Sequence, residues 1–261
     1  HLAVDKTGRC LFTAQYGGGS VGVFPLQADG KVLPRSALVE HQGSGPNRAR
    51  QEGPHPHWVG VDPANRFLFV PDLGIDQVVI YRIELEAGRI ERHGSGRCPA
   101  GGGPRHMKFH PTGRWVYVLN ELSLSITVFD YNADTAVMTP KQTIQTVPKT
   151  LLAKEKFKSA SEIRVHPNGR FVYSANRGHD TITVFRVSQD TGELSVIELE
   201  NVRGATPRNF NLDPSGRWLV AAGQDSNTLA SFEVDPGAGE LTYNRSNVYA
   251  PAPICVMFQH E

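Results

Sequence analysis

The sequence predicts an all-β protein, a β-propeller built from four-stranded antiparallel blades. A turn that begins with Asp or His and closes on Gly-Arg or Asn-Arg occurs five times. Its Gly or Asn stands at positions 8, 65, 113, 169 and 216, so successive copies are 57, 48, 56 and 47 residues apart. Around every copy, short runs of aromatic and β-branched residues are bounded by Pro and Gly, as in consecutive antiparallel strands. A repeat of roughly 50 residues that holds three or four strands is typical of propeller blades.

The runs place the strands of each blade in chain order. A helical repeat is excluded because the units lack apolar residues at the helical period. In the first blade, strands are expected from residue 1, at 11–15 and at 21–24, with an outer strand within 31–40. In the following four blades, they are expected at 58–61, 67–70 and 78–83; at 104–109, 115–119 and 126–129; at 162–165, 171–175 and 181–187; and at 209–212, 218–222 and 229–234.

Three segments interrupt this pattern. Residues 41–53 are rich in Gly and charge, which indicates a loop over one rim. The glycines at 101–103 are expected to form a tight turn rather than a phosphate cradle, because no helix with a GK[ST] motif follows. Residues 141–160 are expected to form a solvated loop, with a lid over the channel mouth as the alternative; this segment carries Lys141, Lys149, Lys154, Lys156 and Lys158.

Residues 1–261 are expected to form a single domain, since no segment between repeats has the composition of a linker. The chain begins inside a strand, and residues 251–258 resemble the first strand of a sixth blade. An open ring leaves strand edges and apolar faces exposed to water. We therefore expect a fragment of a seven-bladed ring that lacks N-terminal blade sequence and part of the C-terminus.

Composition argues against several classes of partner. The chain has 27 Lys and Arg against 26 Asp and Glu, so no overall field attracts nucleic acid or a membrane surface. No apolar run approaches the ~20 residues of a membrane span. Cys10, Cys98 and Cys255 are too far apart for a CxxC site and are expected to be small buried side chains. We expect a cytoplasmic monomer or weak homodimer that binds neither nucleic acid nor membrane.

The repeat serves as an internal control, because a residue that recurs in every blade is needed by the blade. On this ground the turn arginines at 9, 66, 114, 170 and 217 are predicted to be structural, as are Asp5, Asp62 and Asp213. His110 and His166 replace that Asp and are predicted to cap their turns.

Two positions break the repeat and are predicted to form a site. Seven residues after the turn Arg, the blades carry Tyr16, Leu73, Glu121, Arg177 and Gln224. At the start of the first strand, they carry His57, Arg105, Ser161 and Arg208, and the following position holds His1, Trp58, His106, Glu162 and Asn209. Because the first two strands of a meander are antiparallel, both positions lie at one sheet edge, around one mouth of the channel.

Several arginines around one carboxylate and one imidazole suit an anionic substrate, which guanidinium groups bind in a bidentate manner. The alternative is a purely structural ion pair between Glu121 and Arg105 or Arg177. His55 and His57 share one face of a strand, but without a carboxylate shell neither a metal nor another cofactor is expected. No G-x-S-x-G motif stands between a strand and a helix, as a nucleophile elbow requires, and no reactive Cys is present, so a covalent acyl-enzyme is not expected.

Several motifs resemble the seven-bladed lactonase family, which holds the propeller-type 6-phosphogluconolactonases and the fungal 3-carboxy-cis,cis-muconate lactonizing enzymes. The motifs run in order along the chain: His55-Pro56-His57, Asp72-Leu73-Gly74, Gly103-Pro104-Arg105-His106, Asn120-Glu121-Leu122, Ser174-Ala175-Asn176-Arg177-Gly178 and Pro253-Ile254-Cys255-Val256. The resemblance implies that His57, Arg105, Glu121 and Arg177 are the active-site residues.

The activity implied is hydrolysis of a small anionic sugar lactone, 6-phospho-D-glucono-1,5-lactone, to 6-phosphogluconate in the pentose phosphate pathway. Glu121 or His57 is expected to activate water, while Arg105 and Arg177 orient the phosphate and the developing oxyanion. Further substrate contacts are expected from His55, His106, Glu162, Arg208, Tyr16 and Gln224. The alternatives are a lactonizing cycloisomerase acting on a carboxylated muconate and a non-catalytic binding scaffold, whose channel mouth would keep repetitive residues.

Overall fold

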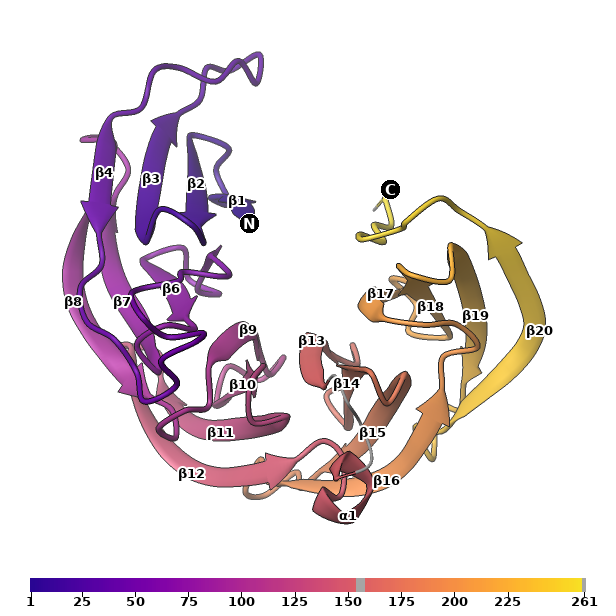
Figure 1. Ribbon diagram of the computed structural model, residues 1–261. Helices are drawn as coiled ribbons and strands as arrows, with labels where there is room; N and C mark the ends of the chain where they lie inside the picture. Colours follow the sequence, from indigo (N-terminus) through magenta and orange to yellow (C-terminus); the bar gives the residue numbers. More distant parts are fainter. Residues whose placement is uncertain (154–157, 260–261) are drawn as a thin grey trace.

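Five four-stranded antiparallel sheets, each one blade of a propeller, stand side by side along an arc (Figure 1). The computed structural model describes residues 1–153 and 158–259. In each sheet the strands follow chain order from the centre of the arc to its rim, and the two ends of the chain face each other across the open side. The predicted propeller fold is therefore confirmed.

The strands have the following bounds. The first sheet holds β1 (Leu2–Val4), β2 (Cys10–Gln15), β3 (Ser20–Pro25) and β4 (Ala37–Glu40), and the second β5 (Gly60–Val61), β6 (Phe67–Asp72), β7 (Gln77–Glu84) and β8 (Arg89–Arg97). The third holds β9 (Pro104–Phe109), β10 (Trp115–Asn120), β11 (Ser125–Asn132) and β12 (Val137–Gln145). The fourth holds β13 (Ser159–Val165), β14 (Phe171–Arg177), β15 (Thr181–Val187) and β16 (Leu194–Asn201), and the fifth β17 (Pro207–Leu212), β18 (Trp218–Gly223), β19 (Thr228–Val234) and β20 (Leu241–Tyr249).

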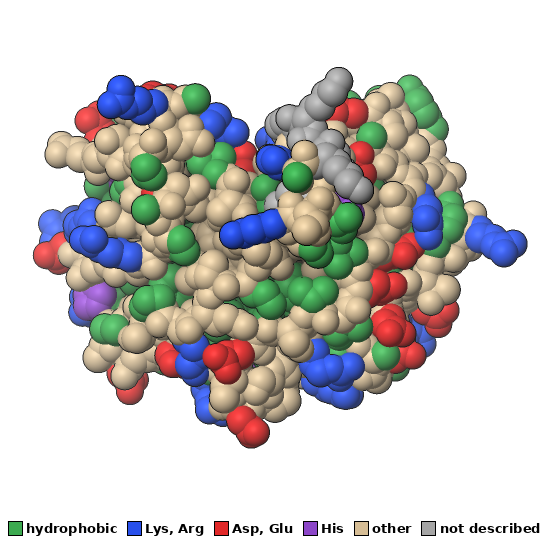
Figure 2. Space-filling model, turned by 60° about the horizontal axis from the view of Figure 1, so that its bottom comes forward, with side chains coloured by type: hydrophobic (Ala, Val, Ile, Leu, Met, Phe, Trp, Pro, Cys, Tyr) green, Lys and Arg blue, Asp and Glu red, His purple; other side chains and the backbone are tan. Residues whose placement is uncertain are grey.

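The core consists of the interfaces between successive sheets. Tyr117 of β10 and Phe185 of β15, for example, are fully buried in one cluster shared by the third and fourth sheets. The second strands β6, β10 and β14 are buried along their whole length, because both of their faces pack against neighbouring blades. On the face shown in Figure 2, acidic and basic side chains are interspersed without a patch of one sign.

The recurring turn residues have the structural role expected of them. Asp62 accepts hydrogen bonds from the backbone N–H groups of Arg66 and Phe67 across its own turn. The turn arginines reach outer hairpins of the following blade: Arg9 pairs with Glu86, Arg66 donates to the Ala133 carbonyl, Arg114 to the Asp190 carbonyl and Arg170 to the Pro236 and Gly237 carbonyls. His166 accepts from the Asn168 N–H, as a turn cap does.

The structure corrects three expectations. Lys141 belongs to strand β12, where its ammonium group lies 2.8 Å from Asp130 Oδ1, so the predicted loop 141–160 begins only after Gln145. Lys149 begins the short helix α1 (Lys149–Leu152). No helix in the described part of the chain is long and apolar enough to span a bilayer. Lys154 and Lys156 lie outside the described residues.

The second correction concerns Cys255, which is exposed, whereas Cys10 and Cys98 are buried as predicted. The third concerns residues 251–258, which form no strand in the described part of the chain. Instead, Asn209 and Asn211 of β17 hold the backbone N–H and carbonyl of Val256. A strand requires a neighbouring strand, and side-chain amides do not supply one.

Candidate active site

A cavity of about 450 Å³ opens at the channel mouth, where the sequence analysis placed the site. Its walls come from the ends of second strands, the starts of first strands and the loop 41–53. The residues that line it are His1, Ala14, Tyr16, Arg50, Pro56, His57, Arg105, Glu121, Arg177 and Arg208.

Irregularities in two of the sheets orient two of these arginine side chains. Where β9 pairs with β10, Pro104 is opposite Asn120 and His106 is opposite Leu119, which leaves Arg105 as the extra residue of a β-bulge. Arg208 is the extra residue in the same way between β17 and β18. A bulge turns a side chain away from the regular alternation, so both guanidinium groups reach the channel mouth.

Glu121 is the centre of the site, and three guanidinium groups surround its carboxylate. Arg105 Nη1 lies 2.5 Å from Oε2, whereas Arg50 Nη2 and Arg177 Nη2 lie 2.8 Å and 3.2 Å from Oε1. The Glu121 side chain is only 4% exposed. Burial raises its pKa, but the charges of Arg105 and Arg177 and the hydrogen bonds from Arg50 and Arg105 outweigh burial and lower the pKa to about 2.

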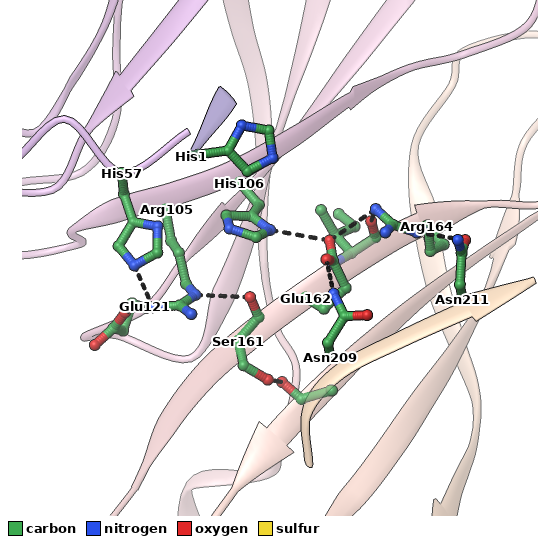
Figure 3. Close-up of polar contacts among 12 residues, drawn as sticks. His1, His57, Arg105, His106, Glu121, Ser161, Glu162, Arg164, Asn209 and Asn211 are labelled. Atoms are coloured by element: carbon green, nitrogen blue, oxygen red, sulfur yellow. Dashed lines mark hydrogen bonds and ion pairs between the residues drawn. The ribbon is translucent and has the colours of Figure 1, made fainter. Parts of the chain in front are cut away.

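His57 and Arg105 form the second contact of the site (Figure 3). Arg105 Nη1 donates to His57 Nε2 at 2.6 Å, and Arg105 Nε donates to the Ser161 carbonyl at 2.7 Å. Because a guanidinium only donates, Nε2 carries no hydrogen and the proton of the neutral ring is on Nδ1. Burial, and then the positive charge of Arg105, lower the pKa of His57 well below 6.5. His57 is therefore neutral near pH 7.

A second polar cluster lies beside the cavity rather than on its wall. Figure 3 shows His106 and Glu162 pointing toward each other, with Arg164 and Asn209 around the Glu162 carboxylate. His106 Nδ1 donates to Glu162 Oε1 at 3.0 Å, and Asn209 Nδ2 donates to Oε2 at 2.6 Å. The His106 ring lies edge-on to His57, with ring centroids 5.2 Å apart. The cluster therefore supports the wall that carries His57 and Arg105.

Buried hydrogen bonds hold the loop 41–53 in place. Gln51 Nε2 donates to the Leu73 carbonyl at 2.8 Å and to Asp76 Oδ1 at 2.7 Å. Asp76 also accepts from the N–H groups of Gly101 and Gly103. The triple-glycine segment is thus a turn, as predicted, and these two N–H groups bind a carboxylate of the protein.

The family model described as "Lactonase, 7-bladed beta-propeller" matches residues 1–258. The chain belongs to this lactonase family. A 6-phosphogluconolactonase of Bacillus subtilis is 38% identical over 261 residues, which cover the whole of this chain and 73% of that protein. A 6-phosphogluconolactonase of Pectobacterium carotovorum is 33% identical over 215 residues, 82% of this chain and 60% of that protein.

Among solved structures, the lactonase chain is similar to the periplasmic gluconolactonase PpgL of Pseudomonas aeruginosa. The TM-score is 0.88 at 33% identity, over 97% of this chain and 70% of that one. The similarity thus extends through all five sheets described above.

The lactonase structure brings together the four residues predicted to be catalytic, His57, Arg105, Glu121 and Arg177, on one cavity wall. Of the six predicted substrate contacts, Tyr16 and Arg208 also line the cavity. Three others do not line the cavity. His55 stacks on the Tyr16 ring, with ring centroids 4.4 Å apart, and His106 and Glu162 belong to the polar cluster beside the cavity.

The sixth predicted contact, Gln224, does not line this cavity in the part of the chain that the structure describes. Its backbone N–H bonds to the Thr206 carbonyl in the turn after β18. Comparison of the repeats within the sequence did not predict Arg50, because Arg50 lies in the loop 41–53, outside the repeat. The only signal was an arginine in an insertion that enters the second blade. Among the described residues, no His, Cys, Asp and Glu side chains group as a metal site would require.

Proposed function

We propose that this protein is a 6-phosphogluconolactonase, which hydrolyses 6-phospho-D-glucono-1,5-lactone to 6-phosphogluconate. The observation that carries the proposal is the charge of the cavity. Four guanidinium groups, of Arg50, Arg105, Arg177 and Arg208, face one carboxylate, that of Glu121. With His57 neutral, three positive charges remain for the substrate, which suits a phosphate dianion and a developing oxyanion.

Glu121 is proposed as the general base rather than His57. Nε2 of His57 already accepts from Arg105, and its other ring nitrogen carries the proton. Glu121 Oε2, in contrast, accepts from Arg105 alone, and a carboxylate oxygen can accept a second hydrogen bond, here from the attacking water. The sequence left this choice open, and the hydrogen bonds favour Glu121.

In the proposed reaction, Glu121 takes a proton from water as the water oxygen bonds to C1 of the lactone. The carbonyl electrons move onto the carbonyl oxygen, where Arg105 and Arg177 stabilise the negative charge. When the tetrahedral intermediate collapses, the bond between C1 and the ring oxygen breaks. The ring oxygen takes up the proton from Glu121 and becomes a hydroxyl group, and C1 becomes a carboxylate after release of one proton to solvent.

The proposal includes a cytoplasmic location, because a phosphorylated sugar carries charges that do not cross a bilayer unaided. One relative in structure is named a periplasmic gluconolactonase, so an unphosphorylated lactone is the natural competing substrate. A monomer or weak homodimer remains the expected state, and independence of a metal remains a prediction.

The test is the disappearance of 6-phospho-D-glucono-1,5-lactone above its spontaneous rate, measured with and without a chelator. The intact protein should accelerate hydrolysis equally in both, and Arg105→Ala should lose most of the acceleration. Glu86→Gln, at an 84% exposed surface carboxylate, is the matched control and should keep it. An intact protein that leaves the spontaneous rate unchanged contradicts the proposed function, and inhibition by the chelator contradicts the metal-independent mechanism.

A further inference from the structure

Arg50 differs from the other two guanidinium groups that hold Glu121. The side chains of Arg105 and Arg177 are 5% and 8% exposed, whereas the Arg50 side chain is 40% exposed. Arg105 and Arg177 come from strands, and each also donates to a backbone carbonyl, of Ser161 and Ala160. Arg50 comes from a loop, and its other hydrogen bond is a long one, 3.4 Å to the hydroxyl of Tyr16. Arg50 is therefore the most exposed of the three partners of Glu121 and the one that does not come from a strand.

The hydrogen bond from Arg50 affects what Glu121 can do. Oε1 of Glu121 accepts from both Arg50 and Arg177, so only Oε2 is left to accept a hydrogen bond from water. Three neighbouring positive charges also make this carboxylate a much weaker base than an ordinary one, and proton transfer is slow when the base is far weaker than the reaction requires. While Arg50 is bound to it, Glu121 is therefore a poor base for the water at Oε2.

We propose that Arg50 is a latch operated by the substrate phosphate: it holds Glu121 in the empty site and moves onto the phosphate when substrate binds. This proposal rests on the proposed function. A phosphate dianion attracts a guanidinium more strongly than a carboxylate monoanion does, and it accepts two parallel N–H bonds. Loss of the Arg50 contact removes one of the positive charges beside Glu121, which makes its carboxylate a stronger base for the water at Oε2.

Arg208 completes the phosphate site in this proposal. Its side chain lines the same cavity as Arg50 and makes no hydrogen bond or ion pair within the described residues. Its positive charge is close enough to lower the pKa of Arg177, after the larger effects of burial and Arg105. An anion bound beside Arg208 would offset this positive charge, so Arg208 provides the phosphate with a second guanidinium group.

The latch predicts that the phosphate group contributes to the chemical step and not only to binding. A detached dianion should then activate the hydrolysis of a substrate that lacks phosphate, because binding energy from a remote group can be used at the reacting centre. The experiment uses D-glucono-1,5-lactone as the substrate and inorganic phosphite as the dianion, with ionic strength held constant by NaCl. We expect phosphite to raise kcat for this lactone at least about tenfold in the intact protein.

Arg50→Ala should give a reversal that a simple binding residue would not give. Without the latch, Glu121 is no longer held, so kcat for D-glucono-1,5-lactone should rise several-fold and should no longer respond to phosphite. For the phosphorylated lactone, kcat/KM should fall roughly 10- to 100-fold, the loss expected from one charge-assisted contact. Arg48→Ala removes the same charge from an exposed position in the same loop and should behave as the parent does.

The pH profile gives a second measurement. The charged and titratable groups that line the cavity with Glu121 are Arg50, Arg105, Arg177 and Arg208, with His1, His57 and Tyr16. Of these, only the Arg50 contact differs between the latched and unlatched states. The acidic limb of kcat for D-glucono-1,5-lactone should therefore move to higher pH in Arg50→Ala, because Glu121 loses one stabilising charge.

The outcomes separate the two proposals. An intact protein that hydrolyses the phosphorylated lactone but ignores phosphite overturns the latch and leaves the proposed function in place. An Arg50→Ala variant that only raises KM for the phosphorylated lactone assigns Arg50 to ordinary phosphate binding and also overturns the latch. Failure to hydrolyse either lactone contradicts the proposed function itself. Thermal unfolding of each variant verifies that it is folded.

Discussion

The Glu121 carboxylate lies among buried guanidinium groups that repel one another. The side chains of Arg105 and Arg177 are 5% and 8% exposed, so neither has enough water around it to screen its charge. Taking such ions out of water costs several kcal/mol each, and this cost is offset only while the carboxylate is present. The same group that is proposed to act as the base therefore also stabilises the local structure.

Glu121→Gln should affect both stability and activity. The neutral amide leaves Arg105 and Arg177 uncompensated, so the free energy of unfolding should fall by about 3 kcal/mol in urea titrations. Loss of a positioned base should lower kcat by roughly 10²- to 10⁴-fold. In the control Glu86→Gln, which breaks only an exposed ion pair, the loss of stability should stay below about 1 kcal/mol. A Glu121→Gln variant with kcat near that of the parent would show that the base is elsewhere.

At the scale of single residues, the repeat predicted six of the side chains that line the cavity. Glu121 and Arg177 stand at one repeated position with five different side chains, so their departure from the pattern was visible. Arg50 was missed because an insertion has no counterpart in the other blades. Glu162 and Gln224 do not line the cavity, which the sequence could not show because position in the chain does not reveal which way a side chain points beside a bulge.

At the scale of elements, neighbouring first strands are joined by buried hydrogen bonds across the channel wall. His106 of β9 donates to Glu162 of β13, and Asn209 of β17 donates to the same carboxylate. Three blades thus meet at one buried acidic group. Burial outweighs the attraction of Glu162 and lowers the pKa of His106 to about 4, so the ring is neutral at pH 7.

The pKa of His106 predicts how stability depends on pH. Its folded value of about 4 lies below its ordinary value of 6.5, so the unfolded chain takes up a proton first as the pH falls. The stability that depends on His106 is complete above pH 6.5 and is lost as the pH falls toward 4, by on the order of 3 kcal/mol. Urea titrations at pH 7 and pH 5 should show a smaller difference for His106→Asn than for the parent. Equal differences would contradict the assignment.

The loop 41–53 depends on one buried side chain, that of Gln51. Removing its two hydrogen bonds in Gln51→Ala should cost roughly 1–3 kcal/mol, because the Leu73 carbonyl and one Asp76 oxygen each lose a donor. The loop should then be cut faster by a protease, and activation of D-glucono-1,5-lactone hydrolysis by phosphite should weaken. Gln42→Ala, at an exposed position of the same loop, should change neither property. Unchanged proteolysis of Gln51→Ala would show that other contacts fix the loop.

The sequence predicted second and third strands closely and outer strands poorly, for a physical reason. Strands such as β10 are buried on both faces, so their apolar runs are continuous. The outer strands β8 and β12 pair on one side only, and most of their residues are exposed. Their sequences therefore resemble loops, which is why Lys141 was assigned to a loop although it lies in β12.

At the scale of the whole molecule, successive blades are locked together at their turns as well as through their apolar faces. His110 Nε2 donates to the Gly169 carbonyl at 2.8 Å, and His166 Nε2 donates to the Gly216 carbonyl at 2.9 Å. Asn65 makes the equivalent contact with Asp5 in the blade before it. The turn motif that revealed the repeat therefore also holds one blade to the next.

Glycine substitutions can separate the two roles of this motif. Gly8, Gly113 and Gly169 have nearly the same backbone, with φ of +72°, +69° and +70°, so alanine should strain each by about 1–2 kcal/mol. An added Cβ meets nothing within 4 Å at Gly8 or Gly113, but it lies 2.7 Å from His110 Nε2 at Gly169. Gly169→Ala should therefore cost a further ~1–3 kcal/mol in the free energy of unfolding, measured in urea. Because the clash is with the imidazole, combining it with His110→Ala should remove this excess, as a double-mutant cycle measures. Equal costs at the three glycines would show that the contact between blades contributes nothing to stability.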